Sequence, residues 1–169
     1  MMKFLWTKST LPFSGIERWV LQQDCSHMQI LFPSYDTGLV FDIYYTGTRV
    51  RFLKDVLASC QVIHEMPLDL TPEQENAVYD LLVEKFNGQK YAFRAALYLG
   101  WRKLLGRWFG LPIPKTNPYL EPGEMFCNMV GGVLSAIGLD VSGELSGMMS
   151  PHDVWVAFQG LNLKPGAAK

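Results

Sequence analysis

The sequence predicts a single α+β domain, residues 1–169, in which helices pack on one face of an antiparallel sheet of four to five strands. Two observations support this fold class. Segments with strand character fill the first half of the chain, and segments with helical periodicity fill the second half. The length of 169 residues, of which 49% are hydrophobic, leaves room for one sizeable core rather than two.

The expected strands are short segments rich in β-branched and aromatic residues, separated by turn residues. The turns include 33–38 and Thr46-Gly47. Connections this short favour antiparallel hairpins and a meander of strands. The expected strands are residues 16–21, 27–32, 39–45 and 48–53, with 61–65 as a fifth.

Helical signals begin at Thr71, where Thr71-Pro72-Glu73-Gln74 predicts a capping box and a helix reaching about Phe86. A second helix is expected before Gly110, with its buried face formed by apolar residues spaced near 3.6. The residues of that face are Phe93, Leu97, Trp101, Leu104 and Trp108.

Two further helices complete the expected fold. One has residues 125–127 in its first turn and stops at Gly138, and a short last helix is capped by Ser150. The tail 164–169 is expected to be frayed. Gly131 and Gly132 weaken a helix interior, which favours a close approach of the third helix to the sheet, the alternative being that glycine is simply tolerated there.

Charge and hydropathy exclude several classes of protein. The 15 basic and 16 acidic residues leave no net field for phosphates, so nucleic acid is not an expected partner. The uncharged run 125–139 falls short of the ~18 apolar residues of a membrane span. The start of the chain lacks the apolar region of a secretory signal, so we expect a protein that is cytoplasmic as synthesised.

Cys127 is the most informative residue. Residues 118–123 can only form a loop, and an uninterrupted helical pattern follows, so the thiol lies in the first turn of a helix. There the unpaired N–H groups and the helix dipole favour the thiolate and can also hold a developing oxyanion. The alternative is a buried structural cysteine that packs as a small apolar residue.

His27 and Asp42 are candidates to work with a thiolate. His27 opens an expected strand, and its ring would therefore lie at an end of the sheet, although a core or surface histidine is the common alternative. Asp42 interrupts the apolar strand segment 40–44. It either points to solvent on the alternating face or orients a neighbouring imidazole.

Three short segments together resemble one known family. They are 26–30, opening a strand with His27, 39–42 on the next strand, and 126–130, opening a helix with Cys127. In residue type and order they are similar to the circularly permuted branch of the NlpC-like papain-fold cysteine hydrolases, which includes lecithin:retinol acyltransferase-like proteins. A histidine that precedes the cysteine marks the permuted branch. The resemblance covers about residues 15–158, the expected catalytic core.

The resemblance implies a permuted papain-like fold in which Cys127 is the nucleophile, His27 is the general base and acid, and Asp42 fixes the imidazole. Tyr91 falls where relatives often carry a tyrosine that lines the substrate cleft. The sequence departs from the family at Asn128, where a serine is common, at Asp42, where a glutamate, a histidine or an amide is usual, and at Ala92, where an aspartate often follows the tyrosine.

The activity implied is cleavage of an amide or ester through a thioester, in an amidase, a thiol peptidase or an acyltransferase. A peptide, a peptidoglycan stem peptide or another N-acyl small molecule is a plausible substrate, and no cofactor is implied. Water or another nucleophile would release the acyl group, and the sequence does not choose between them.

A zinc site is the first alternative, because Cys25, His27, Cys60 and His64 offer two thiols and two imidazoles. On an extended strand, however, Cys60 and His64 lie ~13 Å apart at ~3.3 Å per residue. The chain also contains neither CxxC nor HExxH. We therefore expect no metal, and interpret His64 and His152 as ordinary polar residues.

The second alternative is a non-catalytic structural or binding protein of a larger assembly, such as a phage tail, that retains a hydrolase-like fold. A protein partner and association with a virion would follow. The basic aromatic segment 101–109 could contact lipid or an acidic polymer, but its periodicity favours a helix with one buried face and a solvated cationic edge.

Overall fold

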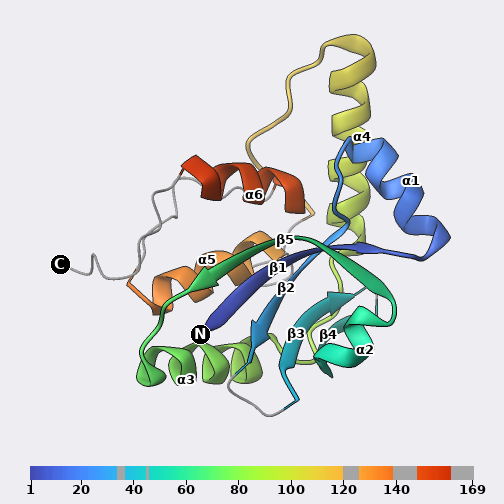
Figure 1. Ribbon diagram of the computed structural model, residues 1–169. Coiled ribbons are helices and arrows are strands. Elements are labelled where there is room, and N and C mark those ends of the chain that lie inside the picture. The colour runs from blue at the N-terminus through green and yellow to red at the C-terminus, as the bar shows by residue number, and fades with distance from the viewer. Residues whose placement is uncertain (34–36, 45, 120–125, 139–147, 161–169) are drawn as a thin grey trace.

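The computed structural model describes residues 1–33, 37–44, 46–119, 126–138 and 148–160, and for residues 12, 13, 44 and 126–128 it describes the backbone alone. Its centre is a five-stranded antiparallel sheet with the strand order β4-β3-β2-β1-β5 (Figure 1). The strands are β1 (Met2–Ser9), β2 (His27–Phe32), β3 (Leu39–Tyr44), β4 (Gly47–Phe52) and β5 (Cys60–Leu68). The predicted α+β class is confirmed.

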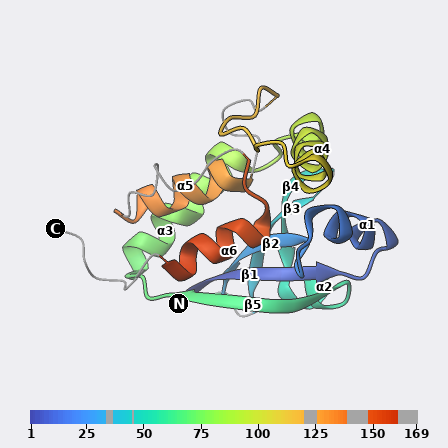
Figure 2. The ribbon, with the colours of Figure 1, turned by 90° about the horizontal axis from the view of Figure 1, so that it is seen from above.

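Seven helical segments accompany this sheet in the described part of the chain. In Figure 2, α3, α5 and α6 lie together over one side of the sheet, while α1 and α4 lie beside each other at one end. The segments are α1 (Pro12–Leu21), α2 (Leu53–Leu57), α3 (Pro72–Leu81), the π-helical turn η1 (Leu82–Phe86), α4 (Phe93–Phe109), α5 (Phe126–Ala136) and α6 (Pro151–Gly160).

The first strand and the first helix correct the sequence prediction. Residues 16–21 belong to α1 and not to a strand, and β1 was not predicted. Pro12 stands in the first turn of α1, where its missing N–H costs no hydrogen bond. β1 lies between β2 and β5, so only β2, β3 and β4 form a simple meander.

The two faces of the sheet have separate cores. The main core contains Trp6, Ile30 and Phe41 from the strands together with side chains of α3, α5 and α6. A smaller core on the opposite face joins Leu5, Leu31 and Val40 to Val56 of α2. Helices therefore cover both faces, although the expected side with α3, α5 and α6 carries most of the buried apolar residues.

An irregularity in the β1–β5 pairing divides β5 between these two faces. Trp6 pairs with His64, but the next residue, Thr7, pairs with Val62. The extra residue reverses the alternation of side chains along β5. Cys60 consequently joins the smaller core, whereas His64 lies on the face of Trp6.

The helix predicted from Thr71 to Phe86 is confirmed as α3 and η1. The Thr71 side chain accepts a hydrogen bond from the Gln74 N–H, and the Gln74 side chain accepts one from the Thr71 N–H. This reciprocal pair is the predicted capping box. The last turn is wider than an α-helix, and the Asn87 N–H bonds the Leu82 carbonyl.

α4 begins and ends where the sequence predicts, but the wrong face was predicted to be buried. The buried residues of α4 are Ala95 and Leu99. The helix packs on α1 at Gly100 and projects beyond the rest of the molecule (Figure 1), and the segment that follows it returns along Gly106 and Arg102. Of the predicted buried face, Phe93, Leu97, Trp101 and Trp108 are each at least 57% exposed, and Leu104 is half-buried.

α5 and α6 confirm the predicted last two helices. Gly138 follows α5 with φ +82°, as expected for a C′ glycine. The Ser150 hydroxyl accepts a hydrogen bond from the Asp153 N–H at the start of α6. Gly132 faces Phe86 and Leu81 rather than the sheet, which corrects the expected reason for that glycine. The tail 164–169 lies outside the described residues.

Candidate functional site

Cys127 lies in the first turn of α5, as predicted, and its side chain lies outside the described part of the structure. The N–H groups of the first helical turn have no partner within the helix and carry the positive end of the helix dipole. A thiol at this position therefore has a backbone environment that favours the thiolate.

α5 is firmly anchored, which fixes the backbone that carries Cys127. Met129, Val130, Val133 and Leu134 have no exposed surface and belong to the main core. These positions recur every three or four residues and so form one continuous buried stripe. The helix contacts α3 and η1 on the side of Gly132.

His27 is the first residue of β2, at the end of the strand nearest α1 (Figure 1). Burial lowers the pKa of His27 below the usual value of 6.5. The Asp42 charge opposes this shift, and the Arg18 charge adds to it. The imidazole is consequently neutral at neutral pH and can accept a proton.

Asp42 is a buried charge rather than a solvated one. Its side chain is 1% exposed, and its carboxylate accepts hydrogen bonds from Gln29 Nε2 at 3.1 Å and from the Arg51 guanidinium at 3.3 Å. Arg49 adds an ion pair at 3.6 Å. Of the two alternatives for Asp42, the solvent-facing one is therefore wrong.

Strand alternation determines where His27 and Cys127 can meet. His27, Gln29 and Asp42 lie on the face of the smaller core, because Met28 and Phe41 point into the main core. The buried stripe of α5 packs in the main core. A contact between the Cys127 and His27 side chains must therefore be made around the end of the sheet where β2 begins.

Tyr91 and Glu17 are two further titratable residues whose pKa values are raised. Tyr91 packs against the main core, and burial, with a contribution from the Glu17 charge, raises its pKa to about 12. Glu17 on α1 has a pKa raised by burial to about 7, although the neighbouring Arg18 opposes the shift. Glu17 was missed because its segment was predicted to be a strand.

Cys25 and Cys60 are buried and free. Burial and the adjacent Asp24 carboxylate raise the pKa of Cys25 to about 12. Burial also raises the pKa of Cys60, and the Asp42 charge adds to this shift. Both residues are therefore thiols at neutral pH and unsuited to nucleophilic attack.

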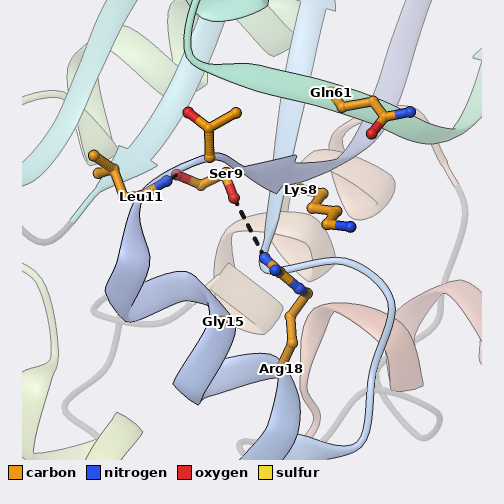
Figure 3. Close-up of a pocket in the computed structure, with 7 residues that line it drawn as sticks. Lys8, Ser9, Leu11, Gly15, Arg18 and Gln61 are labelled. Atoms are coloured by element: carbon orange, nitrogen blue, oxygen red, sulfur yellow. Dashed lines mark hydrogen bonds between the residues drawn. The ribbon is translucent and has the colours of Figure 1, made fainter.

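A pocket of about 410 Å³ lies between the end of β1, the start of α1 and β5 (Figure 3). Lys8, Arg18 and Gln61 contribute polar groups to its wall. The Arg18 guanidinium donates to the Ser9 carbonyl at 3.3 Å and to the Ser14 hydroxyl at 2.7 Å, which fixes its place beside the pocket. Of the predicted site residues whose side chains the structure describes, His27, Asp42 and Tyr91, none lines this pocket.

A further polar cluster joins Asp24 and Cys25, just before β2, to His152 of α6 and His64 of β5. The sequence pointed to only some of the residues in this cluster. Cys25 and His64 were considered as zinc ligands, but nothing local connects them with His152.

Comparison with known proteins gives no assignment, since no family model, no curated protein and no solved structure matches the chain. Among the described residues, we find no helix with the length and apolar composition needed to cross a membrane.

Proposed function

We propose that this protein is a cysteine hydrolase or acyltransferase with a permuted papain-like fold, in which Cys127 is the nucleophile and His27 is the general base and acid. The observation that carries the proposal is the position of Cys127 in the first turn of a helix anchored in the core. The pKa values of Cys25 and Cys60 are raised, so Cys127 is the cysteine that remains for covalent catalysis.

In the proposed reaction, His27 accepts the thiol proton and the Cys127 thiolate attacks the carbonyl carbon of an amide or ester. The first-turn N–H groups of α5 stabilise the oxyanion. When the carbon–nitrogen or carbon–oxygen bond breaks, His27 returns its proton to the leaving amine or alcohol, and a thioester forms. His27 then removes a proton from water or another acceptor, which releases the acyl group and regenerates the thiol.

Asp42 and Tyr91 have supporting parts in this proposal. Asp42 favours the imidazolium that forms after proton transfer, since its negative charge partly offsets the lowering of the His27 pKa by burial. Tyr91 is partly buried, and its hydroxyl keeps its proton because its pKa is raised to about 12. It can therefore line the cleft as a hydrogen-bond donor, without acting as a base.

Selective alkylation tests the proposal. Iodoacetamide at near-neutral pH should label Cys127 far faster than Cys25 or Cys60, and peptide mapping by mass spectrometry resolves the three sites. His27→Ala should slow labelling of Cys127. Equal labelling rates at all three cysteines in the folded protein would refute an activated thiolate.

A non-catalytic component of a larger assembly is the second candidate, and the exposed apolar side chains favour it. Ile16 and Trp19 on α1 and Trp101, Trp108 and Phe109 on α4 are each at least 57% exposed. Apolar surface of this extent is typical of interaction sites. The alkylation experiment separates the two candidates, because an assembly protein needs no activated thiol.

A further inference from the structure

We propose that Asp24, Cys25 and His152 bind a zinc ion, separate from the proposed Cys127 site. Each residue offers one ligand atom, and the three atoms all lie within 4.8 Å of one another. Ligand atoms around tetrahedral zinc are roughly 3.3–3.8 Å apart, given the usual zinc–ligand distances. Small side-chain movements would therefore bring the three groups onto one ion.

The chemistry of the three groups favours zinc over harder cations. Thiolate sulfur and imidazole nitrogen are preferred by zinc, whereas magnesium and calcium prefer oxygen ligands throughout. Cys25 is completely buried, while the Asp24 side chain is 47% exposed. The site thus combines a buried thiol with an exposed carboxylate, so an ion can approach it from the side of Asp24.

The ligands are held by elements far apart in the sequence. Asp24 and Cys25 lie between α1 and β2, and His152 lies in the first turn of α6. Trp6 fixes that turn, because its indole N–H donates to the Pro151 carbonyl at 2.8 Å. An ion at this site would tie the start of β2 to α6.

His64 holds the Asp24 carboxylate in place through the oxygen that is not paired with His152 Nδ1. His64 Nε2 lies 3.0 Å from Asp24 Oδ2, and His152 Nδ1 lies 3.2 Å from Asp24 Oδ1. The His64 ring stacks on Trp155 of α6, with the ring centroids 4.5 Å apart and the planes 5° from parallel. A histidine that orients a ligating carboxylate in this way strengthens metal binding without contacting the metal.

Binding requires the thiolate form of Cys25. The Cys25 proton passes to solvent as the sulfur–zinc bond forms, so one proton is released for each ion bound through this thiol. Solvent or buffer would occupy the fourth position of the metal. The site would then stabilise the fold and would not take part in the proposed thioester chemistry.

Metal titration of the full-length chain tests this proposal. Purified protein should bind one equivalent of zinc, and cobalt in its place should give a sulfur-to-cobalt charge-transfer band. Cys25→Ser should abolish the band, and His152→Ala should abolish binding of the equivalent. His64→Ala should weaken affinity by about 10- to 100-fold.

Cys60→Ser and Cys127→Ser are the matched controls, and neither should change the band. His152 is partly exposed, so His152→Ala should fold, which circular dichroism checks. Zinc should raise the melting temperature of the parent but not that of His152→Ala. Absence of binding by the folded parent, or equal binding by the parent and His152→Ala, would overturn the zinc site and leave the Cys127 proposal untouched.

Discussion

The environment of His27 combines two opposing charges with burial. Asp42 favours the protonated ring, while burial and Arg18 favour the neutral ring, and the balance gives a lowered pKa. A neutral ring is the form that a general base needs before the first proton transfer. In the proposed reaction, the Asp42 charge would limit the cost of the positive charge that forms on the ring.

NMR titration of the His27 ring tests this balance. The pKa in the parent should lie below 6.5. Asp42→Asn should lower it further, because the substitution removes the charge that stabilises the imidazolium. Arg18→Gln should raise it, because the substitution removes a repulsive cation. Shifts in the same direction for both variants would show that their charges do not act on His27 as described.

The raised pKa of Glu17 predicts how the stability of the fold depends on pH. Between pH 4.5 and about 7, the folded protein keeps a proton on Glu17 that the unfolded chain has lost. The free energy of unfolding should therefore fall as pH rises through this range. Glu17→Gln should remove that decrease and be more stable than the parent above pH 7. Urea unfolding followed by tryptophan fluorescence at several pH values measures the difference.

Glu73→Gln is the control for Glu17→Gln, because its effect should have the opposite sign. Hydrogen bonds to the backbone and to Thr71 at the start of α3 lower the pKa of Glu73. Its charged form therefore stabilises the fold, and neutralising it should reduce stability at neutral pH. If the Glu17 and Glu73 variants have parallel stability profiles, the burial of Glu17 is not the cause.

At the scale of elements, the connection from η1 to α4 depends on a close backbone contact with β4. The Thr48 N–H donates to the Gln89 carbonyl at 3.0 Å, and the Gly88 N–H donates to the Thr48 carbonyl at 3.2 Å. Gly47 allows this approach, because a Cβ there would lie 2.5 Å from the Gln89 oxygen. The contact holds the segment that leads to Tyr91.

Gly47→Ala should therefore be clearly destabilising. The added methyl group would clash with Gln89, and φ at Gly47 is +117°, which side chains disfavour. We expect a loss of roughly 1–3 kcal/mol in the free energy of unfolding. Gly160→Ala is the matched control, because its Cβ would meet no atom within 4 Å. Chemical denaturation of both variants provides the comparison, and equal stabilities would contradict the contact.

Local signals predicted those elements that carry strong capping or turn chemistry. The Thr71–Gln74 capping box, Gly110 after α4 and Gly138 after α5 end or begin helices through contacts within a few residues. The exposed face of α4 could not be predicted, since its periodicity does not reveal which side has a neighbour. Similarly, the composition of residues 16–21 is compatible with a strand or with the second half of a helix, and only their contacts decide between the two.

At the scale of the whole molecule, the sheet separates two cores and brings distant segments together. The N-terminal strand β1 is an inner strand that pairs with both β2 and β5. Sequence reasoning located Cys127 and His27 at the ends of their elements, because turn residues precede both. It could not foresee the contact between His152 and Asp24, which are 128 residues apart.

The order of the elements is the basis of the proposed function. The strand that carries His27 comes early and the helix that carries Cys127 comes late, and both begin toward the same end of the sheet (Figures 1 and 2). The smaller core lies on the His27 face, and α5 lies over the other. The proposed catalysis would require the two side chains to meet at that end.

A crystal structure of the protein measures this meeting directly, as the distance from the Cys127 sulfur to the nearer ring nitrogen of His27. The account predicts a separation of about 4 Å or less, within reach for proton transfer. A Cys127 sulfur buried beneath α5, beyond proton-transfer distance of both His27 ring nitrogens, would contradict it.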